Sequence, residues 1–174
     1  MLEITPLIDI DDINDLARPI SAHVDKTKVM TYIREAQDLD VKPSLGSAMF
    51  YDIIKNPAKY NDLLCGGDYK DDCGVTRSFC GLKTAIAYYA YARLVKNIDM
   101  NVTRFGVVQK DDEYSSHVAF KEKNMQYNDA FAIADGYLSE CIDYLNYNKR
   151  EYPNYCGCNK ATGKSRMVVN IIGE

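Results

Sequence analysis

Apolar residues recur at helical spacing along most of the chain, which predicts a mainly α-helical protein. After the potential N-cap Asp25, apolar positions of residues 29–36 fall on one face, whereas Arg34 and Glu35 point toward solvent. A longer segment, from residue 117 to about 150, carries apolar residues at alternating steps of four and three, as in a helix-bundle seam. The seam residues are Tyr127, Phe131, Ala134, Leu138, Cys141 and Leu145.

Start and stop signals divide the first half of the chain into short helices. Asp9 can cap a helical turn that ends before Pro19, and Pro43 and Pro57 suit first-turn positions. The pair Gly66-Gly67 is a stop signal. The buried positions expected after Pro43 are Leu45, Ala48, Met49 and Ile53.

The segment 82–98 is apolar around nearly its whole circumference. Such a helix either lies at the centre of its own domain or packs against its own domain on one face and a neighbouring chain on the other. The periodicity leaves both arrangements open.

Two segments interrupt the helical period. Residues 68–80 have apolar positions flanking a turn at "DDCG", which predicts a small β-hairpin or an ordered loop. Residues 101–116, "NVTRFGVVQKDDEYSS", connect two helical segments. Long connections in compact domains are usually functional, and Arg and aromatic residues are enriched at interface centres. Phe105 either anchors a partner or fills its own core. The interface candidates in this segment are Arg104, Phe105, Val107, Val108 and Tyr114.

Pro153 ends the last helical segment, so we expect a domain of residues 1–150 followed by an extended C-terminal arm, 151–174. The arm ends in a β-prone run from Met167 to Ile172, which contributes Val168, Val169, Ile171 and Ile172 as further interface candidates. A lone strand is unstable, so this run needs a sheet edge in its own chain or in another. The predicted fold class is therefore mainly α: a small bundle of about four to five helices with a short β-hairpin or loop insertion and an extended C-terminal arm.

The charge balance of 21 basic and 25 acidic residues gives a net charge of −4. This argues against a protein that grips nucleic acid, although not against one that surrounds DNA. The 14 tyrosines suit wet contact surfaces or reflect compositional bias alone. The N-terminal sequence lacks a signal-peptide pattern and no apolar run is long enough for a bilayer, so we expect a soluble cytosolic chain without membrane contact.

No pattern of catalytic or metal-binding residues stands out. His23 and His117 belong to no nucleophile or metal motif, and the acidic clusters lack calcium-loop spacing. The six cysteines are expected to be free thiols, with Cys156 and Cys158 the one close pair. We therefore expect no catalytic residue, no metal and no cofactor.

Two other function classes compete with a structural role. Residues 26–54 resemble a helix–turn–helix, which would make the protein a DNA-binding regulator, although the second helix is rich in apolar residues. A thiol enzyme built on Cys156 or Cys158 would need a lowered thiol pKa, for which only Lys160 and Lys164 are nearby.

Four stretches carry a family resemblance: "RPISAHVD", "IREAQDLDVKPSLGSAMFYDII", "GLKTAIAYYAYARLV" and "NVTRFGVVQKDDEYS". Over most of residues 5–150 the chain resembles head–tail connector, or adaptor, proteins of tailed bacteriophages and prophages of Bacteroides-like hosts, crAss-like phages included. The resemblance implies a non-enzymatic virion protein of the neck, assembled in the host cytoplasm as a homo-oligomeric, commonly dodecameric ring beneath the portal protein. Such a ring extends the DNA channel, through which DNA passes without sequence-specific binding, and docks the tail or further neck proteins.

Overall fold

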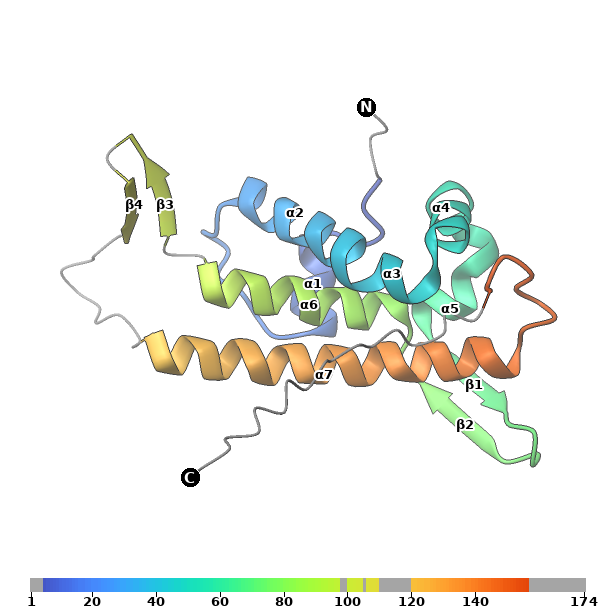
Figure 1. Ribbon diagram of the computed structural model, residues 1–174. Coiled ribbons are helices and arrows are strands. Elements are labelled where there is room, and N and C mark those ends of the chain that lie inside the picture. Colours follow the sequence, from blue (N-terminus) through green and yellow to red (C-terminus); the bar gives the residue numbers. More distant parts are fainter. Residues whose placement is uncertain (1–4, 98–99, 105, 110–119, 157–174) are drawn as a thin grey trace, which may run out of the picture.

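The computed structural model describes residues 5–97, 100–104, 106–109 and 120–156, and these residues are mainly helical. The two longest helices, α6 (Leu82–Asn97) and α7 (Phe120–Tyr147), run in opposite directions and pack along one another (Figure 1). Helix α2 (Lys26–Glu35) packs on the other side of α6, and α1 (Ile10–Leu16) also contacts α6. Helix α6 is therefore the centre of the bundle. Of the two arrangements that its apolar circumference left open, this is the one in which the helix is covered by its own chain.

Side-chain caps fix the starts of the first two helices. Asp9 accepts a hydrogen bond from the Asp12 amide and Asp12 accepts one from the Asp9 amide, both at 2.9 Å, which forms a capping box for α1. Asp25 accepts hydrogen bonds from the amides of Thr27 and Lys28 at the start of α2. Both N-caps predicted from the sequence are confirmed.

Helix α2 continues through a π-helical stretch, η1 (Ala36–Val41), into the short helix α3 (Lys42–Leu45). Gly46, at a φ of 83°, then redirects the chain into α4 (Ser47–Lys55). Because Gly46 breaks the helical phase, the buried face of α4 is formed by Met49, Phe50 and Ile53. The prediction that Ala48 is buried is wrong, since its side chain is exposed.

A 3₁₀ turn, η2 (Pro57–Tyr60), leads into α5 (Asn61–Cys65), and Gly66 ends that helix at a φ of 81°. Strands β1 (Gly67–Lys70) and β2 (Thr76–Phe79) follow as an antiparallel hairpin in which Lys70 pairs with Thr76. The hairpin predicted within residues 68–80 is confirmed.

The core lies between α6 and the helices around it. Leu82, Ile86 and Tyr89 of α6 are buried, and the predicted seam of α7 faces them. Four seam positions are fully or almost fully buried, and the remaining two, Tyr127 and Phe131, are half-buried. The four buried seam residues are Ala134, Leu138, Cys141 and Leu145.

A second antiparallel hairpin lies within the connection between α6 and α7. It consists of β3 (Met100–Thr103) and β4 (Gly106–Gln109). The connection thus contains regular structure, which its lack of a helical period alone did not predict.

After α7 the chain turns back onto the bundle, and Tyr152 and Tyr155 are buried in the core. The body of the fold therefore continues past residue 150, where the sequence placed the start of the arm. The predicted fold class, a mainly helical bundle with a hairpin insertion, is confirmed.

Candidate protein-interaction surfaces

The hairpin β3–β4 carries three of the residues predicted as interface anchors. Arg104 is exposed in the turn between the strands, and Val107 and Val108 lie in β4, where their Cα partners in β3 are Val102 and Asn101. The remaining anchors lie outside the described residues: Phe105, Tyr114, Val168, Val169, Ile171 and Ile172.

Figure 1 shows β3–β4 projecting beyond the end of α6, away from the packed helices. An isolated two-stranded hairpin is only marginally stable in water. In a two-stranded sheet both strands also keep one unpaired edge, which is a template for pairing with another chain. These properties make the hairpin a candidate contact element.

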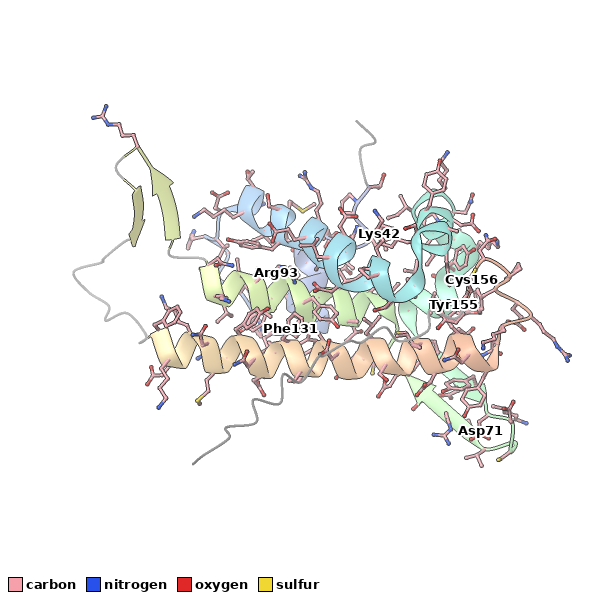
Figure 2. All side chains as sticks on the ribbon, viewed as in Figure 1. Lys42, Asp71, Arg93, Phe131, Tyr155 and Cys156 are labelled. Atoms are coloured by element: carbon pink, nitrogen blue, oxygen red, sulfur yellow. The ribbon has the colours of Figure 1, made fainter. Side chains whose placement is uncertain are left out.

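The hairpin β1–β2 projects near the opposite end of α7 (Figure 1), and Asp71 builds its turn. The Asp71 carboxylate accepts hydrogen bonds from the amides of Cys73 (3.0 Å) and Val75 (2.9 Å), and Arg77 Nε donates to it at 2.8 Å. These donors, Arg77 foremost, lower the pKa of Asp71. Figure 2 shows Asp71 on this hairpin, beyond the bundle.

Aromatic rings fix the base of β1–β2 to the bundle. The Phe79 ring stacks on Tyr144 of α7 with centroids 4.4 Å apart, and Tyr69 packs edge-on against Tyr144 at 5.4 Å. The Tyr144 and Tyr152 hydroxyls are hydrogen-bonded at 2.9 Å, and the Tyr152 ring stacks on Tyr60. This aromatic cluster joins the hairpin, the end of α7 and the segment after α7 in one unit.

The segment after α7 has a second attachment, at Asp52 on α4. The Asp52 carboxylate accepts hydrogen bonds from Asn154 (3.0 Å), Asn56 (2.8 Å) and the Tyr60 hydroxyl, and Lys59 forms an ion pair with it at 3.1 Å. The hydrogen bond from Tyr60, followed by those from Asn56 and Lys59, lowers the pKa of Asp52 far below its usual range. Figure 2 shows Tyr155 and Cys156 of this segment beside α5, where the described chain ends.

A polar cluster connects α6 with its neighbours. Arg93 forms an ion pair with Asp40 of η1 at 2.5 Å and a longer one with Glu35 of α2 at 3.5 Å. Tyr89, one turn earlier on α6, donates a hydrogen bond to Asp135 of α7 at 2.5 Å. Burial raises the pKa of Asp40, although its hydrogen bond with Arg93 opposes the shift. The cluster links α6 to α2, η1 and α7, with Asp135 exposed and the Glu35 side chain 44% exposed.

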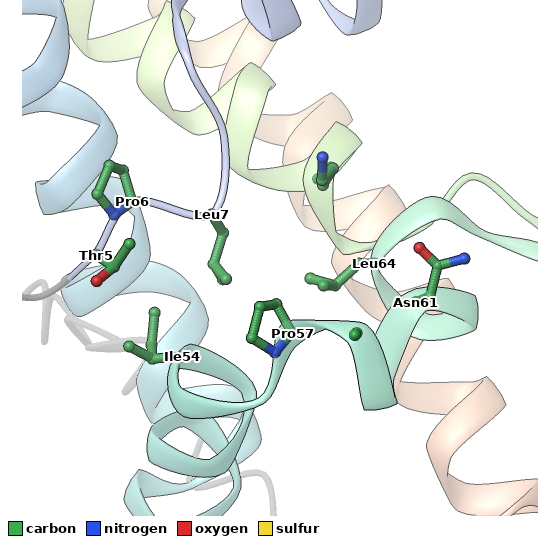
Figure 3. Close-up of a pocket in the computed structure, with 9 residues that line it drawn as sticks. Thr5, Pro6, Leu7, Ile54, Pro57, Asn61 and Leu64 are labelled. Carbon is green, nitrogen blue, oxygen red and sulfur yellow. The ribbon is translucent and has the colours of Figure 1, made fainter.

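Figure 3 shows a pocket of about 270 Å³ between the N-terminal segment and α4, η2 and α5. Leu7, Ile54, Pro57 and Leu64 make its wall mostly apolar. The one charged lining residue, Lys83, lies 4.0 Å from the Asp12 carboxylate. Its other polar lining residues are Thr5 and Asn61.

The candidate catalytic residues form no constellation in the part of the chain that the structure describes. His23 is exposed, and His117 and Cys158 lie outside the described residues. Burial raises the pKa of the Cys141 thiol to about 12, so it is not a nucleophile at neutral pH. Among the described residues, no group of His, Cys, Asp or Glu could hold a metal ion. Cys65, Cys73, Cys80 and Cys156 are exposed free thiols.

The helix–turn–helix alternative depends on residues 26–54. These residues form an almost continuous helical run as far as Leu45, with the reversal at Gly46. The exposed face of α4 includes Ala48, Tyr51 and Lys55. A recognition helix presents several basic or amide side chains to the groove, and α4 does not have them.

No helix in residues 5–97 or 120–156 has the length and apolar character to span a bilayer. The fold and its contact surfaces define a small helical-bundle protein with β-hairpins toward opposite ends of its longest helix. Over residues 41–165 the sequence matches DUF6712, a family of unknown function, and the chain belongs to this family. No curated protein and no solved structure matches the chain.

Proposed function

We propose that this protein is a structural adaptor of a tailed-bacteriophage neck that forms a portal-proximal ring, extends the DNA channel and docks the tail. It carries out no catalysis. The proposal starts from the sequence resemblance to head–tail connector proteins. The observation that carries it in the structure is the hairpin β3–β4, which projects from the bundle and bears Arg104, Val107 and Val108.

The placement of the two hairpins suits a ring. In a heterologous ring each subunit uses two different surfaces, one for the preceding and one for the following neighbour. Hairpins β3–β4 and β1–β2 lie toward opposite ends of α7 and differ in sequence, so they supply two such surfaces (Figure 1). The net charge of −4 is compatible with a wall that DNA passes without adhering.

Co-expression with the portal protein of the same phage tests this function. We expect a complex that co-purifies, and a ring of this protein attached to the portal in electron micrographs. Arg104→Glu reverses a charge in the β3–β4 turn and should weaken the complex at least about tenfold, as at an interface centre. The matched control is Arg34→Glu, which makes the same change on the exposed face of α2 and should leave binding unchanged.

Absence of a complex with the portal, together with absence of the protein from purified virions, would refute the adaptor role. Finding the isolated protein as a monomer would not refute this role, because such subunits can assemble only when they bind their portal. Salt-sensitive binding to short duplex DNA in a gel shift would instead support the regulator.

A further inference from the structure

Strand β1 forms an open edge of the hairpin β1–β2. Strand β2 is the strand whose backbone packs near α7, and Asp68 and Lys70 of β1 are exposed. Where the hairpin turns, the Asp71 amide donates a hydrogen bond to the Val75 carbonyl at 3.0 Å. Because hydrogen-bonding directions alternate along an antiparallel strand, Tyr69 also bonds toward β2. The backbone N–H and C=O groups of Asp68 and Lys70 therefore point outward, ready to pair with a third strand.

The segment that leads into the C-terminal arm packs in the same aromatic cluster as Tyr69 of β1. Tyr152 packs on Tyr144 with ring centroids 5.8 Å apart, and Tyr144 in turn packs on Tyr69 of β1. The hydrogen bond from Asn154 to Asp52 holds the segment just before Cys156. A flexible tether of the length of residues 157–166 has a root-mean-square span of about 17 Å. The run 167–172 can therefore reach β1 of its own chain.

The charges of the arm and of its surroundings are complementary. Residues 157–173 contain the cations Lys160, Lys164 and Arg166 and no acidic residue. Around the aromatic cluster, burial raises the pKa of Tyr69, Tyr144 and Tyr152, and nearby carboxylates add to the shift: Asp143 for Tyr69, and Asp62 and Glu151 for the other two. Arg77, the Cα partner of Tyr69 in β2, is already bound to Asp71.

We propose that residues 167–172 dock on the outer edge of β1 in the same chain and form the third strand of this sheet. Met167, Val169 and Ile171 then lie on the side of Tyr69, where Tyr147 of α7 remains 40% exposed and offers apolar surface. Asn170 lies on the opposite, solvent-facing side. Intramolecular docking is favoured because a short tether gives an effective concentration in the millimolar range.

Amide hydrogen exchange of the isolated full-length protein tests the docking. In the wild type, the Asp68 and Lys70 amides should exchange at least about tenfold more slowly than in Val168→Pro/Val169→Pro, which removes donors from the run. Thr162→Pro places a proline in the tether instead. In this variant the Asp68 and Lys70 amides should exchange as slowly as in the wild type. The Tyr69 and Asp71 amides, which point toward β2, should differ less, and α6 amides provide the internal reference.

Equal exchange of Asp68 and Lys70 in the wild type and the double-proline variant would overturn the proposal. Protection that disappears on dilution would also overturn it, because the strand would then come from a second copy. The experiment uses the isolated chain without the portal, so its failure and the failure of the adaptor role are separate results.

Discussion

Gly66 and Gly81 face each other, backbone against backbone, where the hairpin β1–β2 joins the bundle. A Cβ on Gly66 would collide with the Phe79 carbonyl, and a Cβ on Gly81 with the Gly66 amide nitrogen. Both residues have φ near +80°, a conformation that side chains with a Cβ rarely adopt. The close approach closes the base of the hairpin and positions Phe79 in the aromatic cluster.

We therefore expect Gly66→Ala or Gly81→Ala to lower the free energy of unfolding by at least about 2 kcal/mol, since left-handed strain and a backbone collision add. Urea denaturation followed by circular dichroism measures the change. Gly74→Ala is the matched control: its φ is 78° but the space is open, so about 1 kcal/mol is expected. Gly136→Ala, in open space within α7, should stabilise by about 0.5–1 kcal/mol. Equal losses at Gly66, Gly74 and Gly81 would contradict the collision.

The ion pair between Arg93 and Asp40 leads to a second prediction. The side chains are only 14% and 12% exposed, so removing one partner leaves a poorly hydrated charge. We expect Arg93→Ala to cost about 3 kcal/mol of unfolding free energy, and Arg93→Met combined with Asp40→Leu to restore most of it. Lys42→Ala removes the cation of the more exposed pair with Asp38 and should cost less than about 1 kcal/mol. Similar costs for Arg93→Ala and Lys42→Ala would show that the Arg93 pair is effectively solvated.

Local signals in the sequence predicted the elements that local chemistry determines. Caps at Asp9 and Asp25, the stop at Gly66 and the seam of α7 each depend on residues within a few positions. The long-range contacts have no such signal. No local pattern marks Arg93, and Glu35 was expected in solvent, although the two form an ion pair.

The segment after α7 shows the same limit. Pro153 predicted a helix end at about residue 150, and α7 ends at Tyr147. Asn154, however, bonds to Asp52, which lies 102 positions earlier in the chain. A pattern read along the chain cannot show that pairing. The candidate interface was found from its place between two helices, and the structure puts Arg104, Val107 and Val108 on a projecting hairpin. The identity of the partner depends also on the surface of that partner, which the sequence of this chain does not contain.

Acid stability should depend on Asp52. Its pKa is lowered in the folded protein, so its contacts contribute stability above the unfolded-state pKa of about 3.9, and this contribution is lost as the pH falls below that value. We expect Asp52→Asn to be less stable than the wild type at pH 7, with the difference shrinking between about pH 4 and pH 2. Asn154→Ala, which removes one of the donors, should show a smaller difference at pH 7. Urea midpoints at each pH measure these differences, and a gap independent of pH would contradict the assignment.

The contribution of Tyr89 to stability should have the opposite pH dependence to that of Asp52 and fall at alkaline pH. Burial, and then the hydrogen bond to Asp135, raise the pKa of Tyr89 above its usual value, so the folded state favours the neutral phenol. Its contribution to stability is complete below the unfolded-state pKa of about 10 and falls as the pH rises further, because the unfolded chain ionises first. Tyr89→Phe should cost about 1 kcal/mol at pH 8 through the lost hydrogen bond. Between pH 9 and pH 11 the thermal midpoint of Tyr89→Phe should fall less than that of the wild type or of Tyr51→Phe, a control at an exposed position. Parallel alkaline losses in all three proteins would mean that Tyr89 ionises as readily in the fold as in the unfolded chain.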